Sequence, residues 1–492
     1  MGRSSAPPHD QWTAQHCWIV RVREEPHGLK PVATDVQKAA VEAHEVVIIG
    51  GGFAGLSAGV ALAERGFHVT LLEGKPALGG RAYSFPDTES GDLVDNGQHV
   101  LMGCYHQTLD FLGKIGTRDR LIVHRNLEIE MLDGPGRRAH LRTASLPGPF
   151  HITAGLMRYQ HLTLAERLGA LRAGMRMMYM RRFARGRLKR MTVAEFMNLT
   201  GQSSQARRTF WYPLAIATLN EQPKLASAAL LAEVMKRAFF AHRNDSAFLY
   251  PRVGLTELYC SAAREFIERR GGVVASRTIA DTLEIGSDMV SAVGLRDGAK
   301  LRATNFIVAV PPIQLLRLLP EALVSNGGFS KIHALKSSPI ICVHAWLDRE
   351  VTGSAFIGFV GTTTQWMFNK RRIFSQYGAY HPGYLSFVIS GARELADLPN
   401  GDLLKIVLDD LGAMIPAARQ AQVIKALVLK EKHATFAADP ASDAVRPPVQ
   451  TAIPNLFLAG DWIQTELPAT IESAVIAGRS AAAAIAARAA RR

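Results

Sequence analysis

A strand followed by a glycine-rich turn constrains the fold of this chain more than any other feature. Residues 45–55 have the sequence EVVIIGGGFAG, and the next apolar segment ends in an acid, Glu73. In such a unit the first glycine allows a tight turn, the second lets a pyrophosphate approach the backbone, and the third lets helix pack on strand. The three glycines here are Gly50, Gly52 and Gly55. The pattern predicts a dinucleotide site, with phosphates at the helix N-terminus and Glu73 accepting hydrogen bonds from ribose hydroxyls.

The size and composition of the chain are those of a globular protein with more than one domain. It has 492 residues, of which 48% are hydrophobic and 20% are charged. A chain of this length can bury a large core and is expected to form two or more domains. Its formal net charge of +14 is compatible with nucleic acid, an anionic membrane or an acidic substrate as a partner.

The cysteines argue against a disulfide framework and against a zinc site. Cys17, Cys104, Cys260 and Cys342 are far apart and form no CxxC pair. We therefore expect no metal site, a reducing compartment and a cytoplasmic protein. No apolar run reaches about 18 residues, so no transmembrane helix is expected. Residues 1–44 lack the apolar core of a secretory signal and are expected to be a flexible extension.

Two further segments suit the same ligand. Residues 79–81 have the sequence GGR, so a loop can pass close to phosphate while Arg81 offers a positive charge. Residues 455–461 (NLFLAGD) predict a strand that ends in glycine and acid, and a long helix is predicted to begin within 468–472. Asp461 can accept hydrogen bonds from polyol hydroxyls, and the start of the helix can stabilise negative charge.

Residues 156–191 form the most basic stretch of the chain. Apolar residues recur there at helical spacing between arginines, which predicts an amphipathic helix. The basic residues are Arg158, Arg167, Arg172, Arg176, Arg181, Arg182, Arg185, Arg187, Lys189 and Arg190, against one acid, Glu166. The apolar residues are Leu164, Leu168, Leu171, Met175 and Met178. Two interpretations stay open: a helix lying on an anionic membrane surface, or a helix packed on the core with a solvated basic face.

The three separated segments together resemble a known superfamily. GGGFAG with Glu73, GGR at 79–81 and LAGD at 458–461 resemble the flavin-containing amine oxidases and phytoene desaturases, and the resemblance extends from about residue 45 to the end. A narrower resemblance is to bacterial hydroxysqualene dehydroxylases. It rests on residues 95–104 (DNGQHVLMGC), 211–221 (WYPLAIATLNE), 244–246 (NDS), 250–252 (YPR) and 467–473 (LPATIES).

The resemblance implies an α/β fold with FAD as the cofactor. It implies a Rossmann-like, three-layer FAD-binding domain with a parallel sheet, and an inserted mixed α+β substrate domain. The FAD-binding domain is expected to comprise residues 45–120, 250–312 and 450–492. The substrate domain, which is also expected to face the membrane, would comprise residues 121–249 and 313–449.

The resemblance also implies which residues contact FAD. Four groups follow the cofactor from its ADP half to the flavin ring. They are Gly50, Gly52, Ala54, Gly55 and Glu73 at the ADP half; Gly80 and Arg81 by the pyrophosphate and flavin; Gly97, Gln98 and His99 close to the isoalloxazine; and Gly460 and Asp461 at the ribityl–pyrophosphate side, with Thr470 and Ile471 at the pyrimidine edge.

The reaction that the resemblance implies is reductive. Reduced FAD would replace the allylic hydroxyl of hydroxysqualene with hydrogen, giving squalene, water and oxidised FAD, in squalene and hopanoid biosynthesis. The protein would exclude water and protonate the leaving hydroxyl. The candidate acids are Glu221, Asp245 and His99, although each can equally be a capping, salt-bridging or structural residue.

Other functions stay open. An oxidative carotenoid- or squalene-type desaturase, or an amine oxidase, would hold FAD in the same way. A non-catalytic, FAD-stabilised scaffold in a membrane isoprenoid complex would also bind the cofactor. We expect an apolar isoprenoid substrate, contacts with squalene-pathway enzymes and the inner face of a bacterial membrane, and an electron donor that the sequence does not identify. Nucleic acid is not an expected partner, because the basic stretch 156–191 has few aromatic residues and no nucleic-acid recognition motif.

Overall fold

The predicted glycine turn follows the central strand of a five-stranded parallel sheet. The computed structural model describes residues 45–286, 288–325, 328–374 and 381–491, so the predicted extension 1–44 lies outside the described residues. The strand order is β10-β2-β1-β14-β20, and every neighbouring pair is parallel. The strands are β1 (Glu45–Ile49), β2 (His68–Glu73), β10 (Val273–Ser276), β14 (Asn305–Val308) and β20 (Leu456–Leu458). The predicted α/β fold with a parallel sheet is confirmed.

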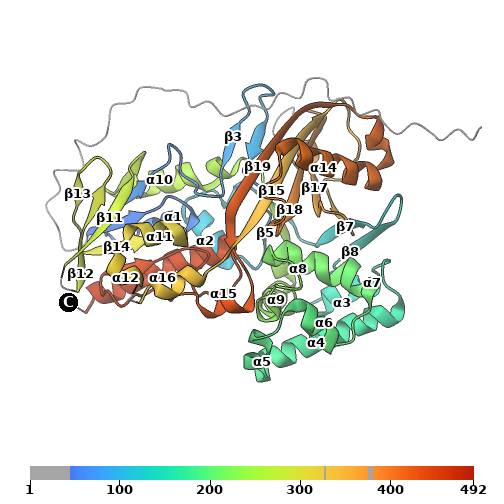
Figure 1. The fold of residues 1–492 in the computed structure, drawn as a ribbon, viewed down its shortest axis with the longest axis horizontal. Coiled ribbons are helices and arrows are strands. Elements are labelled where there is room, and N and C mark those ends of the chain that lie inside the picture. Colours follow the sequence, from blue (N-terminus) through green and yellow to red (C-terminus); the bar gives the residue numbers. More distant parts are fainter. Residues whose placement is uncertain (1–44, 287, 326–327, 375–380, 492) are drawn as a thin grey trace, which may run out of the picture.

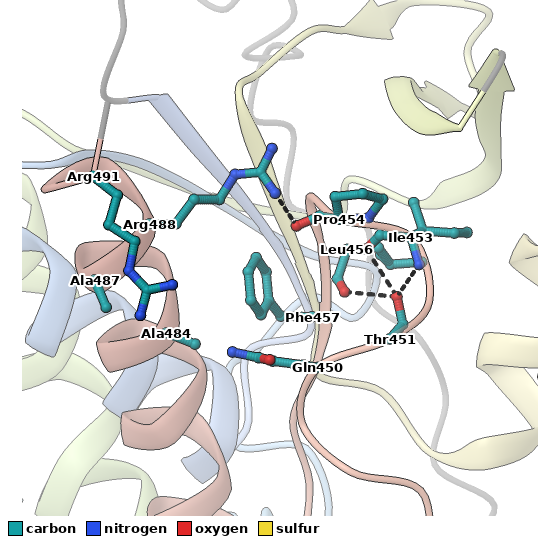
Figure 2. Close-up of a pocket in the computed structure, with 10 residues that line it drawn as sticks. All are labelled: Gln450, Thr451, Ile453, Pro454, Leu456, Phe457, Ala484, Ala487, Arg488 and Arg491. Atoms are coloured by element: carbon teal, nitrogen blue, oxygen red, sulfur yellow. Dashed lines mark hydrogen bonds between the residues drawn. The ribbon is translucent and has the colours of Figure 1, made fainter.

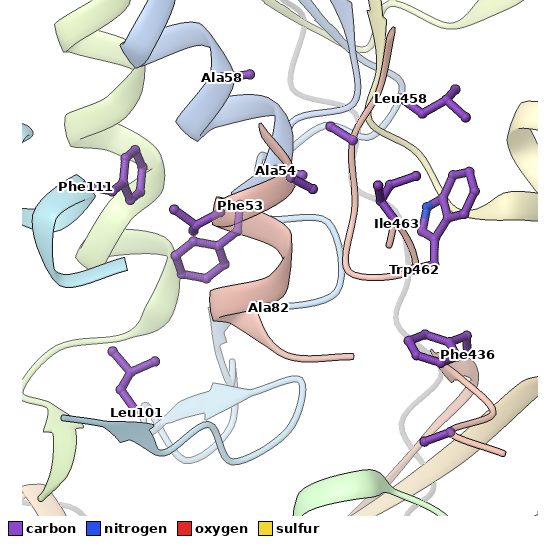
Figure 3. Close-up of a cluster of buried hydrophobic side chains, with 14 of the residues drawn as sticks. Phe53, Ala54, Ala58, Ala82, Leu101, Phe111, Phe436, Leu458, Trp462 and Ile463 are labelled. Atoms are coloured by element: carbon purple, nitrogen blue, oxygen red, sulfur yellow. The ribbon is translucent and has the colours of Figure 1, made fainter. Parts of the chain in front are cut away.

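Helices pack beside this sheet, and two of them, α1 (Phe53–Ala63) and α16 (Ile471–Ala489), are in direct backbone contact. The others include α2 (His106–Lys114) and α10 (Ser261–Glu268). All residues of α1 are buried, and α16 lies directly against it because Gly478 has no side chain: a Cβ there would lie 2.1 Å from the carbonyl oxygen of Ala54. Phe53 stacks on Tyr259 at 3.6 Å. It meets Phe111 edge-on at 6.3 Å (Figure 3).

A seven-stranded sheet forms the second large unit. Its order is β19-β15-β18-β17-β16-β7-β8, antiparallel except where β16 meets β7. The strands are β7 (Glu128–Leu132), β8 (Arg138–Arg142), β15 (Ser337–Leu347), β16 (Phe356–Phe359), β17 (Trp366–Asn369), β18 (Gly383–Ser390) and β19 (Val423–Phe436). Apolar residues of β15 and β18 share a core with Leu403, Val407 and Leu411 of α14 (Asn400–Met414).

A lobe of helices lies beside this sheet (Figure 1). It contains α3 (Phe150–Met157), α4 (Leu164–Phe183), α5 (Arg185–Lys189), α6 (Val193–Leu199), α7 (Ser204–Ala206), α8 (Tyr212–Leu219) and α9 (Ala228–Met235). α4 covers most of the basic stretch, and it begins with a capping box between Thr163 and Glu166. Within the described ranges, no helix has both the length and the apolar character needed to cross a membrane.

Short elements complete the described fold. Three small sheets are β3 (Ser84–Pro86) with β4 (Leu93–Asp95); β5 (Leu101–Met102), β9 (Phe248–Pro251) and β6 (Leu121–His124); and β11 (Ala280–Gly286), β12 (Met289–Leu295) and β13 (Lys300–Leu301). The remaining α-helices are α11 (Pro312–Leu318), α12 (Glu321–Ser325), α13 (Lys370–Phe374) and α15 (Pro440–Ala444). The domain boundaries at residues 120, 249, 312 and 449 stay a prediction.

The contact between α1 and α16 can be tested with Gly478→Ala. Alanine normally stabilises a helix relative to glycine, by roughly 0.5–1 kcal/mol. Here the new methyl group would lie 2.1 Å from the Ala54 oxygen, so we expect a lower free energy of unfolding in denaturant titrations. The matched control is Gly113→Ala in α2, where a Cβ meets no atom within 4 Å. Equal stability of the two variants would contradict this account.

Candidate active site

The turn between β1 and α1 depends on glycine at two positions. Gly50 has φ +112°, and a Cβ there would lie 2.5 Å from the carbonyl oxygen of Ala309. A Cβ on Gly55 would lie 1.9 Å from the carbonyl oxygen of Gly50. Side chains at either position would therefore push the first turn of α1 away from the strands. Ala54 lies in that first turn and is buried.

The first turn of α1 borders a space that two glycines keep free of side chains. Helix α1 has Gly52 as its N-cap, and no side chain of the described residues caps it. A Cβ on Gly52 would meet only Gly80 Cα at 3.8 Å and the Gly79 carbonyl oxygen at 4.0 Å. Unsatisfied amides at a helix N-terminus, together with its positive end, favour an anion such as a pyrophosphate.

Glu73 is held at the end of β2, beside the same turn. Its carboxylate accepts hydrogen bonds from the backbone amides of Gly51 and Lys75, each at 2.8 Å. A carboxylate has about four acceptor sites, so Glu73 keeps capacity for ribose hydroxyls. Its role toward a ribose stays a prediction.

Arg81 connects three segments that are far apart in the sequence. Its guanidinium donates to the Asp461 carboxylate at 2.6 Å and to the carbonyl oxygens of Ala434 and His433 at 2.6 and 3.3 Å. Asn96 in turn donates to the carbonyl oxygen of Arg81 at 3.1 Å. The sequence placed Arg81 and Asp461 on one ligand, and the structure brings their side chains into direct contact.

A buried arginine that the sequence did not single out holds the loop after Asp461. The Arg446 guanidinium donates to the carbonyl oxygens of Leu467 at 2.7 Å and of Trp462 and Asp461 at 3.3 Å. Burial lowers the pKa of Arg446, against the carboxylate of Asp443, which raises it. Gly460, which directly precedes Asp461, has φ +150°.

The start of α16 is ordered by its own side chains. The Thr470 hydroxyl caps the helix by accepting from the Ser473 amide at 3.1 Å. Glu472, in the same first turn, accepts from the amides of Gln107 and Thr108 at the start of α2, both at 2.9 Å. The predicted pyrimidine contacts Thr470 and Ile471 therefore lie at the junction of α16 and α2.

The loop that contains Gly97, Gln98 and His99 rests on a fully buried lysine. Lys370 donates to the Asp95 carboxylate at 2.7 Å and to the Gln98 side-chain oxygen at 2.9 Å. Burial alone would raise the pKa of Asp95, but Lys370 and Ser84 outweigh it, so that pKa lies below its usual range. No sequence pattern pointed to Lys370, because this lysine follows an ordinary segment, WMFN.

His99 is a neutral, hydrogen-bonded imidazole. Its Nδ1 lies 2.7 Å from the Gly97 carbonyl oxygen, which can only accept, so Nδ1 carries the hydrogen. Burial lowers the pKa of His99, and Lys370 and Arg81 add to this effect. Burial also lowers the pKa of His344, to about 3. Neither histidine is a ready proton donor at neutral pH.

Glu221 and Asp245 are both buried, but their partners differ. Both oxygens of Glu221 are bonded to the Arg393 guanidinium, at 2.5 and 2.6 Å. The two groups form a bidentate ion pair. The Asp245 carboxylate instead lies 2.8 Å from Nε2 of His106 and accepts a hydrogen bond from the backbone amide of His242 at 3.0 Å.

A pocket elsewhere on the protein is not this site. It is lined by Gln450, Thr451, Ile453, Pro454, Leu456, Phe457, Ala484, Ala487, Arg488 and Arg491 (Figure 2). Ala484 lies about 21 Å along α16 from the helix start at Thr470. The pocket therefore borders the last turns of α16, while the predicted flavin contacts border its first turn.

The comparisons with known proteins agree with this geometry. The family model of the flavin-containing amine oxidoreductases matches residues 53–486. The chain belongs to this family, is an oxidoreductase and uses FAD. The uncapped start of α1, the space between Gly52 and Gly80 and the carboxylate of Glu73 fit the phosphates and ribose of that cofactor.

Relatives of known function include the group whose motifs the chain resembles. The hydroxysqualene dehydroxylase of Zymomonas mobilis is 27% identical, over 88% of this chain and 97% of that protein. The hydroxysqualene dehydroxylase of Sinorhizobium fredii is 29% identical, over 89% and 97%. A 15-cis-phytoene desaturase from an Oncidium hybrid is 27% identical, over 90% of this chain and 77% of that protein. The resemblance found in the sequence is confirmed.

Solved structures show the same fold at low identity. An oxidoreductase from Methanosarcina mazei superposes with a TM-score of 0.70 at 15% identity, covering 89% of this chain and 99% of that one. A reduced UDP-galactopyranose mutase superposes with a TM-score of 0.66 at 15% identity, covering 91% and 96%. These matches support the fold and do not distinguish substrates.

The phosphate site can be tested with Gly52→Asp. A Cβ fits at this position, so we expect the variant to fold, while its carboxylate enters the space that the phosphates need. Purified protein should lose flavin absorbance but keep its far-ultraviolet circular dichroism. Gly113→Asp adds the same charge where a Cβ meets no atom within 4 Å, and should stay yellow. A yellow Gly52→Asp protein would place the cofactor elsewhere.

The pair Lys370–Asp95 can be tested through stability. Lys370→Met leaves a buried carboxylate without its cation, which should lower the free energy of unfolding by about 3–5 kcal/mol. Lys370→Met with Asp95→Asn should recover part of this loss, measured by denaturant titration.

The effect should also depend on pH, because the folded pKa of Asp95 is lowered. The stabilisation by the pair is present above the ordinary aspartate range and is lost as pH falls through the folded pKa. The wild-type protein and Lys370→Met should therefore converge in acid. A difference that is constant down to the acid limit would contradict an ionic role.

Proposed function

We propose that this protein catalyses the FAD-dependent reductive dehydroxylation of hydroxysqualene to squalene. The observation that carries the proposal is similarity along nearly the whole length of three hydroxysqualene dehydroxylases, each matched over 97% of its own length. Phytoene desaturases are matched over 77–78% of theirs, at similar identity. The motifs at 95–104, 211–221 and 467–473 support the same proposal.

The residues of the site would divide the work as follows. The start of α1 with Gly52 and Gly80 would hold the phosphates, Glu73 the ribose, and Arg81 with Asp461 the centre of the cofactor. When bound and reduced, FAD supplies the two electrons and the hydrogen that replace the hydroxyl. Lys370 would act as a positioning residue, because its two hydrogen bonds fix the loop that carries Gly97, Gln98 and His99.

We propose that the pair Asp245–His106 supplies the proton for the leaving hydroxyl. A histidine oriented by a carboxylate is a common general acid–base arrangement in enzymes. Two contacts support a position of this pair near the predicted flavin site. His106 begins α2, and the next two residues, Gln107 and Thr108, donate hydrogen bonds to Glu472. Glu472 directly follows Ile471, a predicted flavin contact. Glu221 and His99 stay weaker candidates, since Glu221 is paired with arginine and His99 is neutral.

The reaction is tested anaerobically. The purified flavoprotein is reduced chemically, hydroxysqualene is added, and flavin absorbance is followed while squalene is measured by mass spectrometry. We expect reoxidation with one squalene formed per flavin. Bleaching of the oxidised protein by phytoene or squalene would favour a desaturase, peroxide release with an amine would favour an amine oxidase, and bound FAD without any turnover would favour a scaffold.

The proton donor is tested with Asp245→Asn and His106→Gln. We expect each to keep its flavin and to slow squalene formation by about 10²-fold or more, with an altered pH–rate profile. The matched controls are Glu128→Gln and His140→Gln on β7 and β8. They remove another pair with an exposed histidine, but its carboxylate is exposed, whereas Asp245 is buried. Unchanged rates and pH profiles for Asp245→Asn and His106→Gln would exclude the pair and return attention to Glu221→Gln.

A further inference from the structure

Helix α4 exposes a continuous apolar stripe on the outside of the protein. Five large apolar side chains on it are between 44% and 68% exposed: Leu164, Leu168, Met175, Tyr179 and Phe183. At about 100° per residue they fall within an arc of roughly 100° on the helix. Figure 1 shows α4 along the outer edge of the helical lobe.

The inward face of α4 is made of different residues. Ala170, Ala173, Gly174, Met177 and Met180 are buried, and they lie on the side of the helix opposite the exposed stripe. Of the five apolar residues that predicted this helix, Leu171 and Met178 pack against the core, whereas Leu164, Leu168 and Met175 are exposed. The core-packing interpretation is therefore right for the inward side of the helix and wrong for these three side chains.

Basic residues share the exposed side of this helix. Arg172, Arg176 and Arg182 are exposed. The guanidinium groups of Arg176 and Arg182 lie 5.7 and 5.2 Å from the rings of Tyr179 and Phe183. The only acid between residues 164 and 190 is Glu166, whose carboxylate is used in the capping box at the helix start.

We infer that this face of α4 docks on an anionic lipid surface. The docking face consists of Leu164, Leu168, Arg172, Met175, Arg176, Tyr179, Arg182 and Phe183. The charge pattern specifies the occupant: apolar side chains would enter the acyl boundary while the arginines bind lipid phosphates. The helix is about 30 Å long, so it would lie in the plane of the interface rather than cross it. The inference goes beyond the proposed reaction and does not depend on it.

The basic residues that follow extend the same charge. Arg187, Lys189 and Arg190 are exposed after the end of α4. Arg185 pairs with Glu466 at 2.5 Å, in the loop that follows Asp461. The segment just after the docking face is thus joined by this ion pair to the loop between the predicted cofactor contacts Asp461 and Thr470, which would orient the site relative to the membrane.

The test is binding of the full-length, FAD-loaded protein to vesicles by co-sedimentation. Phosphatidylcholine vesicles with and without phosphatidylglycerol are compared, because only the second kind carries net negative charge. We expect binding to the anionic vesicles, which weakens as salt is raised. The triple variant Arg172→Gln, Arg176→Gln, Arg182→Gln should weaken it on the order of a hundredfold.

Two further triple variants separate the contributions. Met175→Gln, Tyr179→Gln, Phe183→Gln keeps the charge but removes apolar area, and should also lower affinity for anionic vesicles. The control is Arg118→Gln, Arg302→Gln, Arg317→Gln, which removes three exposed arginines outside the helical lobe and should bind like the wild-type protein. Flavin absorbance and circular dichroism establish that each variant is folded.

Three outcomes would overturn the inference. They are no binding to anionic vesicles, equal binding by the wild-type protein and both α4 variants, and an equal loss in the control, which would reflect net charge alone. Self-association that depends on Met175, Tyr179 and Phe183, without vesicle binding, would instead make the stripe a contact between copies of this chain. None of these readouts involves turnover, so they are independent of the outcome for the proposed reaction.

Discussion

The close approach of backbones around the first turn of α1 is the constraint on which the rest of the structure depends. Gly55 lies against the Gly50 carbonyl, and Gly478 of α16 lies against the carbonyl of Ala54. A side chain at these positions would separate the helices from the sheet and from each other. Because the chain has glycine there, α1 and α16 pack directly against each other although they lie far apart in the sequence.

Three cations, of which Lys370 and Arg446 are buried and Arg81 is half-buried, then connect the loops around that site. Arg81 joins its own loop to β19 and Asp461, Arg446 holds the loop from Asp461 to Leu467, and Lys370 holds the loop that starts at Asp95. Each cation has carboxylate or carbonyl partners, which offset the free energy of removing a charge from water. The loops thereby gain defined positions without a regular sheet or helix to fix them.

The same fold separates the chemistry from the surface that would deliver the substrate. The predicted cofactor contacts of the β1–α1 turn lie at the parallel sheet, whereas the exposed stripe of α4 lies on the helical lobe. A long apolar isoprenoid has little solubility in water, so a protein that acts on it gains from contact with the membrane in which that substrate dissolves. The ion pair Arg185–Glu466 is a direct link between the two regions.

The sequence by itself determined the parallel sheet, the glycine turn, Glu73 and the resemblance to flavin-dependent oxidoreductases, because these depend on local patterns of glycine, apolar residues and acids. It also predicted that Gly79–Arg81 and Gly460–Asp461 contact one ligand, because a glycine loop can pass close to phosphate and Asp461 can accept hydrogen bonds from polyol hydroxyls. Only the tertiary structure revealed Lys370, Arg446 and His106 as partners of distant residues. Only the tertiary structure decided that Leu164, Leu168 and Met175 face outward, because helical spacing gives the position of a face but not the element that packs against it.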